Sequence, residues 1–158
     1  MKKILNRSIS AALLLISLLS VVGTNVALAQ VTVTGGTTAV YGDLKSAFTA
    51  INAGTHFGNI VVSLTQTAVA AGGTCVLNGS GAGAANYTSV TICPTVDNVV
   101  LSTATVTGRG VIELNGADNV TIDGDNPNTA GVNRDLTIQN TAANTVSLTS
   151  CIRLATSA

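Results

Sequence analysis

The chain has 158 residues, and its seven Lys and Arg residues balance its seven Asp and Glu residues, so the formal net charge is zero. Nucleic-acid binding depends on a basic surface that neutralises phosphates, so this composition argues against a nucleic-acid partner. The one long apolar run, residues 11–23, has 13 residues and falls short of the ~20 that a membrane-spanning helix needs. The length allows a single domain.

The first residues have the features of a secretory signal peptide. Three basic residues occur within the first seven positions, the apolar run follows, and Ala27-Leu28-Ala29 supplies the small residues that precede a cleavage site. We therefore predict a signal peptide over residues 1–29, export through the Sec pathway, and a secreted or cell-surface protein without a membrane span after cleavage. Residues 30–158 contain four basic and seven acidic residues, a net charge of −3.

The composition of the exported part is typical of short strands and turns. Thr and Val favour strands because their branched side chains pack well on a pleated surface, and Gly and Asn favour turns. One helix is predicted over residues 43–53, with Asp43 as its N-cap and Gly54 as its left-handed end. Its expected buried face consists of Leu44, Ala47, Phe48 and Ile51, which recur at helical spacing.

Short apolar segments after the helix are predicted to be strands. Residues 97–101 resemble residues 118–122 at an offset of 21, and residues 111–114 resemble residues 151–154 at an offset of 40. Short strands that recur at a period near 20 favour a parallel β-helix, a solenoid, over the alternative of a β-sandwich. The predicted strands are residues 60–64, 89–92, 99–101, 111–114, 120–122, 136–138 and 152–154.

Three segments, in their order along the chain, resemble a known family. Residues 41–55, 86–92 and 114–124 are similar to the start of large, secreted, right-handed parallel β-helix proteins of pectin-lyase-like architecture. These are adhesin-like proteins on the surface of Gram-negative bacteria. The resemblance implies an all-β fold that begins a right-handed parallel β-helix, with the helix over residues 43–53 as its N-terminal cap.

The resemblance also implies a domain organisation. Residues 30–59 would form an N-terminal strand and the capping helix, and residues 60–158 would form the first rungs of the β-helix. Proteins of this kind are many hundreds of residues long, and a solenoid needs several repeats and a cap at both ends. We therefore expect the sequence to be the N-terminal piece of a longer protein.

The three cysteines lie in the part of the chain that we expect to be exported, where disulfides persist. Cys75 and Cys93 flank a loop rich in Gly and Ala, and they are our candidates for a disulfide. The alternative is that they are free thiols acting as small core residues. Cys151 would then lack a partner within this sequence or be buried and free. The sequence contains no C-x-x-C motif, so it does not support a zinc or redox site.

The acidic residues cluster between residues 113 and 135. Asp123-Gly124-Asp125-Asn126 begins like a calcium-binding loop, but Pro127 and Arg134 occupy positions where such a loop needs a ligand. We therefore predict no cofactor and interpret these carboxylates as turn-stabilising groups. An irregular calcium site at Asp123 and Asp125 is the alternative.

Catalytic residues are not evident in the sequence. Polysaccharide hydrolysis needs paired carboxylates, and the single histidine, His56, is predicted to lie in a surface loop. Arg109, Arg134 and Arg153 are predicted to face solvent separately. We predict a non-catalytic cap and first rungs of an exported surface protein, with a structural or adhesion role and an extracellular glycan or surface protein as partner. The alternative is the N-terminal part of a polysaccharide lyase or hydrolase whose active site lies downstream.

Overall fold

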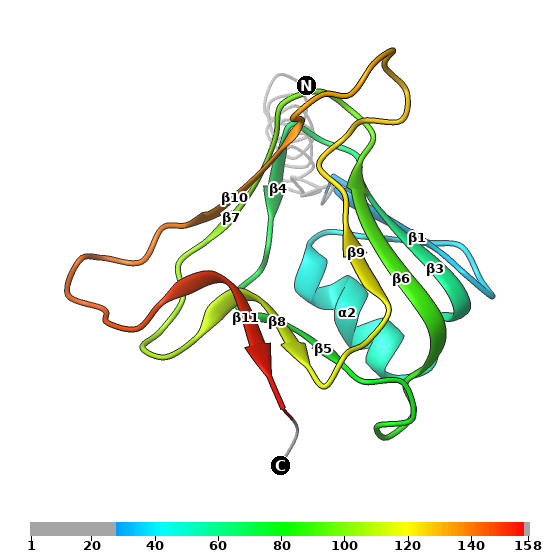
Figure 1. Cartoon of the computed structure of the whole chain (residues 1–158), viewed down its shortest axis with the longest axis horizontal. Helices are drawn as coiled ribbons and strands as arrows, with labels where there is room; N and C mark the ends of the chain where they lie inside the picture. Colours follow the sequence, from blue (N-terminus) through cyan, green and yellow to red (C-terminus); the bar gives the residue numbers. More distant parts are fainter. Residues whose placement is uncertain (1–27, 157–158) are drawn as a thin grey trace, which may run out of the picture.

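A computed structural model of the chain describes residues 28–156, which form three small sheets and one helix around a shared core (Figure 1). The predicted signal peptide, residues 1–29, lies outside the described residues except for its last two positions. Within the described part of the chain, no helix has the length and apolar character needed to cross a membrane.

The first sheet is mixed, and its strands follow the spatial order β2-β1-β3-β6-β9. Strand β1 pairs antiparallel with both of its neighbours, whereas β3, β6 and β9 pair in parallel. The five strands are β1 (Val31–Thr34), β2 (Ala39–Tyr41), β3 (Phe57–Leu64), β6 (Asn86–Pro94) and β9 (Val120–Ile122).

The other two sheets have three parallel strands each. The second sheet contains β4 (Ala68–Ala70), β7 (Val99–Thr103) and β10 (Leu136–Asn140), with β7 in the centre. The third sheet contains β5 (Cys75–Asn78), β8 (Gly110–Asn115) and β11 (Ser150–Ala155), with β8 in the centre. Consecutive strands from β3 onward therefore belong to different sheets.

The fold class expected from the sequence, a right-handed parallel β-helix, is wrong, and the β-sandwich alternative is wrong as well. The strands form three small sheets, one mixed and two parallel, and none of them forms a solenoid. The expected period near 20 does not occur, because Val90 pairs with Val120, 30 positions later, whereas Gly110 pairs with Ser150, 40 positions later. The parallel pairing rules out the sandwich, whose strands are antiparallel.

The two internal similarities have different outcomes. Residues 111–114 and 151–154 pair side by side in the third sheet, with Glu113 opposite Arg153, so the offset of 40 is confirmed as a strand pairing. Residues 97–101 and 118–122 lie in different sheets and do not pair. Their similarity reflects a shared turn, because Asn98 and Asn119 both adopt positive φ angles, 56° and 53°, directly before a strand.

Helix α2 (Leu44–Asn52) confirms the helix that the apolar spacing predicted. The carboxylate of Asp43 accepts a hydrogen bond from the backbone N–H of Ser46 at 2.7 Å, as expected of an N-cap. Gly54, with a φ of 74°, follows the C-cap residue Ala53 in the left-handed conformation. The four residues of the expected apolar face, Leu44, Ala47, Phe48 and Ile51, are all buried.

The helix covers the free edge of β5. The side-chain amide of Asn52, its last residue, donates to the carbonyl of Val76 at 2.8 Å and accepts from the N–H of Asn78 at 2.9 Å. One asparagine thus satisfies two backbone groups on β5 that a neighbouring strand would otherwise pair. The apolar faces of α2 and the three sheets then enclose a single core.

The position of Gly54 generates a stability prediction. A Cβ at Gly54 would lie 2.5 Å from the carbonyl oxygen of Ala84, whereas a Cβ at Gly58, where φ is also 74°, would meet nothing within 4 Å. We expect Gly54→Ala to lower the free energy of unfolding by roughly 2–3 kcal/mol in urea titrations, and Gly58→Ala by only about 1–2 kcal/mol, the cost of the left-handed backbone. Equal losses in the two variants would contradict a role for the contact with Ala84.

Candidate functional site

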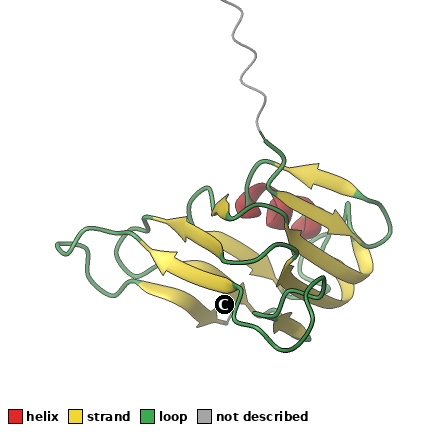
Figure 2. Cartoon of the chain, turned by 90° about the horizontal axis from the view of Figure 1, so that it is seen from above, coloured by secondary structure: helices red, strands yellow, loops and turns green. Residues whose placement is uncertain are grey.

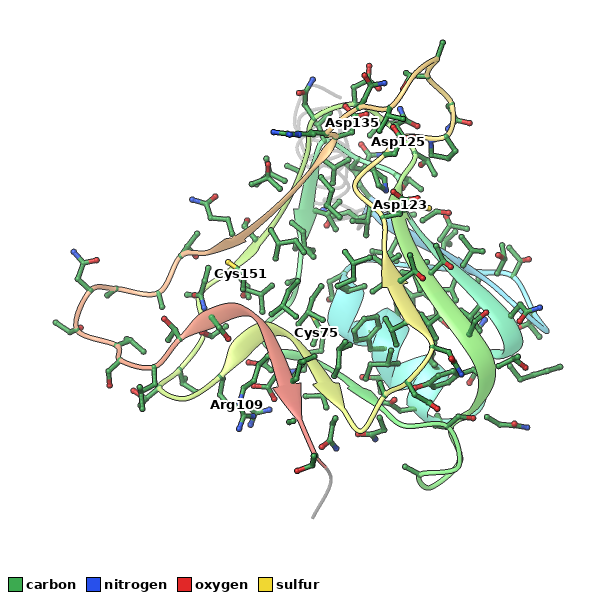
Figure 3. All side chains as sticks on the ribbon, viewed as in Figure 1. Cys75, Arg109, Asp123, Asp125, Asp135 and Cys151 are labelled. Atoms are coloured by element: carbon green, nitrogen blue, oxygen red, sulfur yellow. The ribbon has the colours of Figure 1, made fainter. Side chains whose placement is uncertain are left out.

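The side chains of Arg109, Glu113 and Arg153 converge on the third sheet, and we call them the Arg–Glu–Arg cluster. Glu113 lies on β8, Arg153 is its direct neighbour on β11, and Arg109 comes from the turn before β8. Ile112 is fully buried in the core, and alternation along the strand directs Glu113 to the opposite face. Arg109 lies on the side of the sheet that faces away from the core (Figure 3).

The carboxylate of Glu113 is the centre of the cluster. Its Oε1 accepts hydrogen bonds from Arg109 Nε at 2.8 Å and from the Gly110 N–H at 2.9 Å, and it lies 3.4 Å from Arg153 Nη1. The Glu113 side chain is 3% exposed, whereas those of Arg109 and Arg153 are 42% and 45% exposed. The two guanidinium groups therefore cover a buried carboxylate while their outer N–H groups reach solvent.

The partners of Glu113 decide its protonation. Burial alone raises the pKa of Glu113, but the hydrogen bonds from Arg109 and Gly110 and the charges of both arginines outweigh it and hold the pKa below its usual range. The same hydrogen bond raises the pKa of Arg109. A general acid or base needs a pKa near the working pH and access to a substrate. Glu113 has neither, so its arrangement serves the structure of the sheet.

Two of the arginines thus differ from the sequence expectation of separate, solvent-facing side chains. Arg109 and Arg153 share one carboxylate, whereas Arg134 lies exposed in the loop before β10. The sequence contained the signal for this grouping, since Arg109 and Glu113 are four positions apart and the offset of 40 places Arg153 opposite Glu113. Neither the spacing of Arg109 and Glu113 nor the offset of 40 was sufficient to predict this grouping without knowledge of the strand pairing.

His56 is fully buried, so the expectation of a surface-loop histidine is wrong. Its Nδ1 lies 3.1 Å from the carbonyl oxygen of Thr37, which can only accept, so Nδ1 carries the proton and donates. In the neutral ring Nε2 is then the acceptor, and Tyr41 O–H donates to it at 2.7 Å. Burial raises the pKa of Tyr41. The hydrogen bonds of the His56 ring connect β2 and the turn before it to the start of β3, and the ring has no contact with solvent.

The structure does not join Cys75 and Cys93 in a disulfide, and all three cysteines are free thiols. Cys75 lies on β5 in the third sheet and Cys93 on β6 in the first, so the loop between them connects different sheets. Cys75 Sγ donates to the carbonyl of Ala71 at 3.1 Å. Burial, with a smaller contribution from Asp43, raises the pKa of Cys75 to about 12. Cys151 is exposed on β11 (Figure 3).

The two calcium candidates, Asp123 and Asp125, lie at the start of the loop over residues 123–135 (Figure 3). Asp123 Oδ1 accepts from the N–H of Asp125 at 3.0 Å, and Asp125 Oδ1 accepts from the N–H of Asn133 at 2.7 Å. Both carboxylates therefore stabilise the backbone of the loop. Among residues 28–156, no group of three or more His, Cys, Asp or Glu side chains is arranged to hold a metal ion.

The thiols provide a test of the cysteine assignment. We expect the exposed Cys151 to react readily with a thiol reagent at pH 8 in the folded chain, and Cys75 to react only on unfolding, because the thiolate is the reactive form. The measurement is a count of reactive thiols before and after unfolding without a reductant. Three thiols after unfolding would agree with the structure, whereas a single thiol would show that Cys75 and Cys93 form a disulfide after all.

The Arg–Glu–Arg cluster generates a pH-dependent prediction. Because the pKa of Glu113 is lowered in the folded chain, its contribution to stability is complete above the ordinary glutamate pKa near 4.3 and is lost as the pH falls through the folded value. We expect Glu113→Gln to lower the free energy of unfolding by about 1–3 kcal/mol at pH 7.

The difference between wild type and Glu113→Gln should shrink at pH values below about 4, where the wild-type carboxylate becomes protonated. Urea titrations of both proteins across this range measure the difference, and the comparison cancels the titration of the other carboxylates. A difference that stays constant through the acid range would contradict the lowered pKa.

Comparisons with known proteins do not assign the chain to a family. No protein-family model matches it, and neither a curated protein nor a solved structure is similar to it at a significant level. The resemblance to pectin-lyase-like surface proteins therefore stays a prediction from the sequence.

Proposed function

We propose that this chain is a non-catalytic module of an exported protein, with a structural or adhesion role and an extracellular glycan or surface protein as its partner. The observation that carries the proposal is that hydrogen bonds and ion pairs within the fold engage the chain's single glutamate and its single histidine. Glu113 is held ionised by two arginines, and both ring nitrogens of the buried His56 are hydrogen-bonded. General acid–base catalysis needs such groups within reach of a substrate.

The outward surface of the sheets supports a role in contact rather than in chemistry. Outward-facing positions carry hydroxyl and amide side chains such as Thr121, Thr137 and Gln139, which are exposed and carry no charge. These groups can donate and accept hydrogen bonds to sugar hydroxyls or to another protein without the desolvation cost of a charged group. The net charge of −3 over residues 30–158 also opposes a nucleic-acid partner.

Export and surface location belong to the same proposal. They are supported by the basic start, the apolar run and the small residues at positions 27–29, which together are typical of a cleaved signal peptide. The resemblance of residues 41–55, 86–92 and 114–124 to segments of secreted surface proteins agrees with this location.

The proposal predicts binding without turnover. The full chain should be retained on at least one polysaccharide, neutral or acidic, or on intact bacterial cells, and it should release neither new reducing ends nor unsaturated sugars from any polysaccharide. The unfolded chain is the control for non-specific retention. Glu113→Gln should bind like the wild type under conditions in which it is folded.

Two results would overturn the proposal. One is an activity that copurifies with the chain and releases new reducing ends or unsaturated sugars from a polysaccharide. This result would favour a polysaccharide lyase or hydrolase. The other is a lack of retention on every polysaccharide and on cells, which would remove the adhesion role.

A further inference from the structure

The negative charge of residues 30–158 is concentrated at one loop. Residues 123–135 connect β9 to β10 and lie against the turn before β7, and we call this connection the aspartate loop. The loop and the turn together carry a net charge of −3, whereas the remaining charged residues of 30–158 cancel one another. The charged residues of the loop and the turn are Asp97, Asp123, Asp125, Arg134 and Asp135.

Neighbouring bases do not neutralise these aspartates. Both ion pairs found among residues 28–156 lie in the Arg–Glu–Arg cluster, and Arg134 is exposed. The side chains of Asp123, Asp125 and Asp135 gather on the side of the molecule opposite that cluster (Figure 3). Carboxylates gathered in this way repel one another, and a bound cation would remove the repulsion.

Asp135 is the buried member of the group. It is 7% exposed, and its Oδ2 is the one buried side-chain oxygen or nitrogen of residues 28–156 that has no hydrogen-bond partner. Its Oδ1 has only a long hydrogen bond, 3.4 Å, from the N–H of Asn98. A carboxylate that loses water without gaining a partner carries a large desolvation penalty. Asp135 therefore lacks the compensation that Glu113 receives from its two arginines.

Asp97 supplies a second carboxylate at the same place, because Asn98, whose N–H reaches Asp135, is the next residue in the chain. Asp97 Oδ1 accepts from Nδ2 of the buried Asn126 at 2.7 Å, and hydrogen bonds within the described part of the chain leave its Oδ2 free. The N–H of Asp135 donates to the carbonyl of Gly124 at 2.8 Å and joins the two ends of the aspartate loop. The fold thus holds both carboxylates beside one turn.

We propose that the aspartate loop and the turn before β7 bind one Ca²⁺ ion, held by the carboxylates of Asp135 and Asp97. Ca²⁺ takes about six to eight oxygen ligands, which include carboxylates, backbone carbonyls and water. Residues 28–156 contain no group of three His, Cys, Asp or Glu side chains arranged for a metal, so carbonyl oxygens and water complete the coordination.

This site differs from the alternative that the sequence suggested at Asp123 and Asp125. Those two carboxylates accept backbone N–H groups through their Oδ1 atoms and shape the loop. In the proposed site they contribute negative charge near the ion, and the ligands come from the buried Asp135 and from Asp97 in a different part of the chain.

The ligands and the loop favour Ca²⁺ over other metal ions. Carboxylate and carbonyl oxygens suit hard cations such as Ca²⁺ and Mg²⁺. Mg²⁺ requires near-octahedral geometry, whereas the coordination of Ca²⁺ is flexible and fits a loop without regular secondary structure. With two carboxylate ligands, the expected dissociation constant is on the order of 0.1–1 mM, as in weak calcium sites.

The experiment compares the purified full chain in CaCl₂ and in EDTA. Calorimetric titration should show one Ca²⁺ per chain, and urea titrations should show a free energy of unfolding that rises with the CaCl₂ concentration by mass action. NaCl at the same ionic strength is the control for screening of surface charges, and its effect should be smaller.

Two variants and a matched control locate the site. We expect Asp135→Asn and Asp97→Asn each to raise the dissociation constant for Ca²⁺ at least about tenfold. Asp118→Asn is the control, because Asp118 lies in the same kind of turn before β9, where Asn119 has a φ of 53° as Asn98 has 56° before β7. It removes the same charge outside the loop and should bind Ca²⁺ like the wild type.

The stability of Asp135→Asn separates a cation site from a carboxylate that only supports the loop. In EDTA the variant should be at least as stable as the wild type, because it removes a buried charge that has no partner. In CaCl₂ the order should reverse, because only the wild type gains from the ion. A variant that is less stable than the wild type by the same amount in both solutions overturns the proposal.

Backbone hydrogen exchange supplies a measurement at the loop itself. Ca²⁺ should slow the local exchange of amides in residues 124–135 and leave those of β1 and β2 unchanged. The helix and β1 and β2 lie together in the view from above (Figure 2). Equal slowing in the loop and in these strands would overturn a local site.

Three further results would overturn the proposal. The first is a lack of Ca²⁺ binding up to about 10 mM, ten times the weakest affinity expected. The second is an equal stabilisation by NaCl, and the third is a loss of binding in Asp118→Asn as large as in Asp97→Asn. None of these outcomes depends on whether the chain binds a glycan.

Discussion

Parallel pairing between strands that are 29 to 40 positions apart holds the three sheets around one core. Parallel strands cannot be joined by a tight turn, so each pair needs a long connection. Here that connection contains strands of the other two sheets, as when the chain passes from β3 through β4 and β5 to β6. No sheet can therefore form without the other two, and the stability of each depends on the shared apolar interior.

The polar groups inside the fold follow from this constraint. Once β8 and β11 pair in register, Glu113 and Arg153 become neighbours, and the turn before β8 brings Arg109 to the same carboxylate. Once the turn between β1 and β2 lies against the start of β3, where the N–H of Phe57 donates to the carbonyl of Gly35, His56 is buried and finds its partners in Thr37 and Tyr41. At both sites the hydrogen bonds offset the desolvation free energy of the buried polar group. They leave little capacity for acid–base chemistry on a substrate.

Local signals in the sequence determined the helix and most strand positions. Asp43, the spacing of Leu44, Ala47, Phe48 and Ile51, and Gly54 act within one or two turns, so α2 was predictable. All seven predicted strands lie within observed ones. The prediction missed β4 and β5, because Ala68–Ala70 and Cys75–Asn78 are short and have weak strand patterns, and it expected one strand before the helix where the structure has two, β1 and β2.

Only the tertiary structure decided which strands belong to which sheet. That assignment corrected the β-helix with a period near 20, separated Cys75 from Cys93 into different sheets, buried His56 and brought Arg109 and Arg153 to Glu113. The turn shared by Asn98 and Asn119 shows why: it repeats in the sequence because left-handed asparagines recur before strands, not because the strands are neighbours. Which strands become neighbours in a sheet depends on how connections of unequal length fold around one core, and no local sequence pattern contains that information.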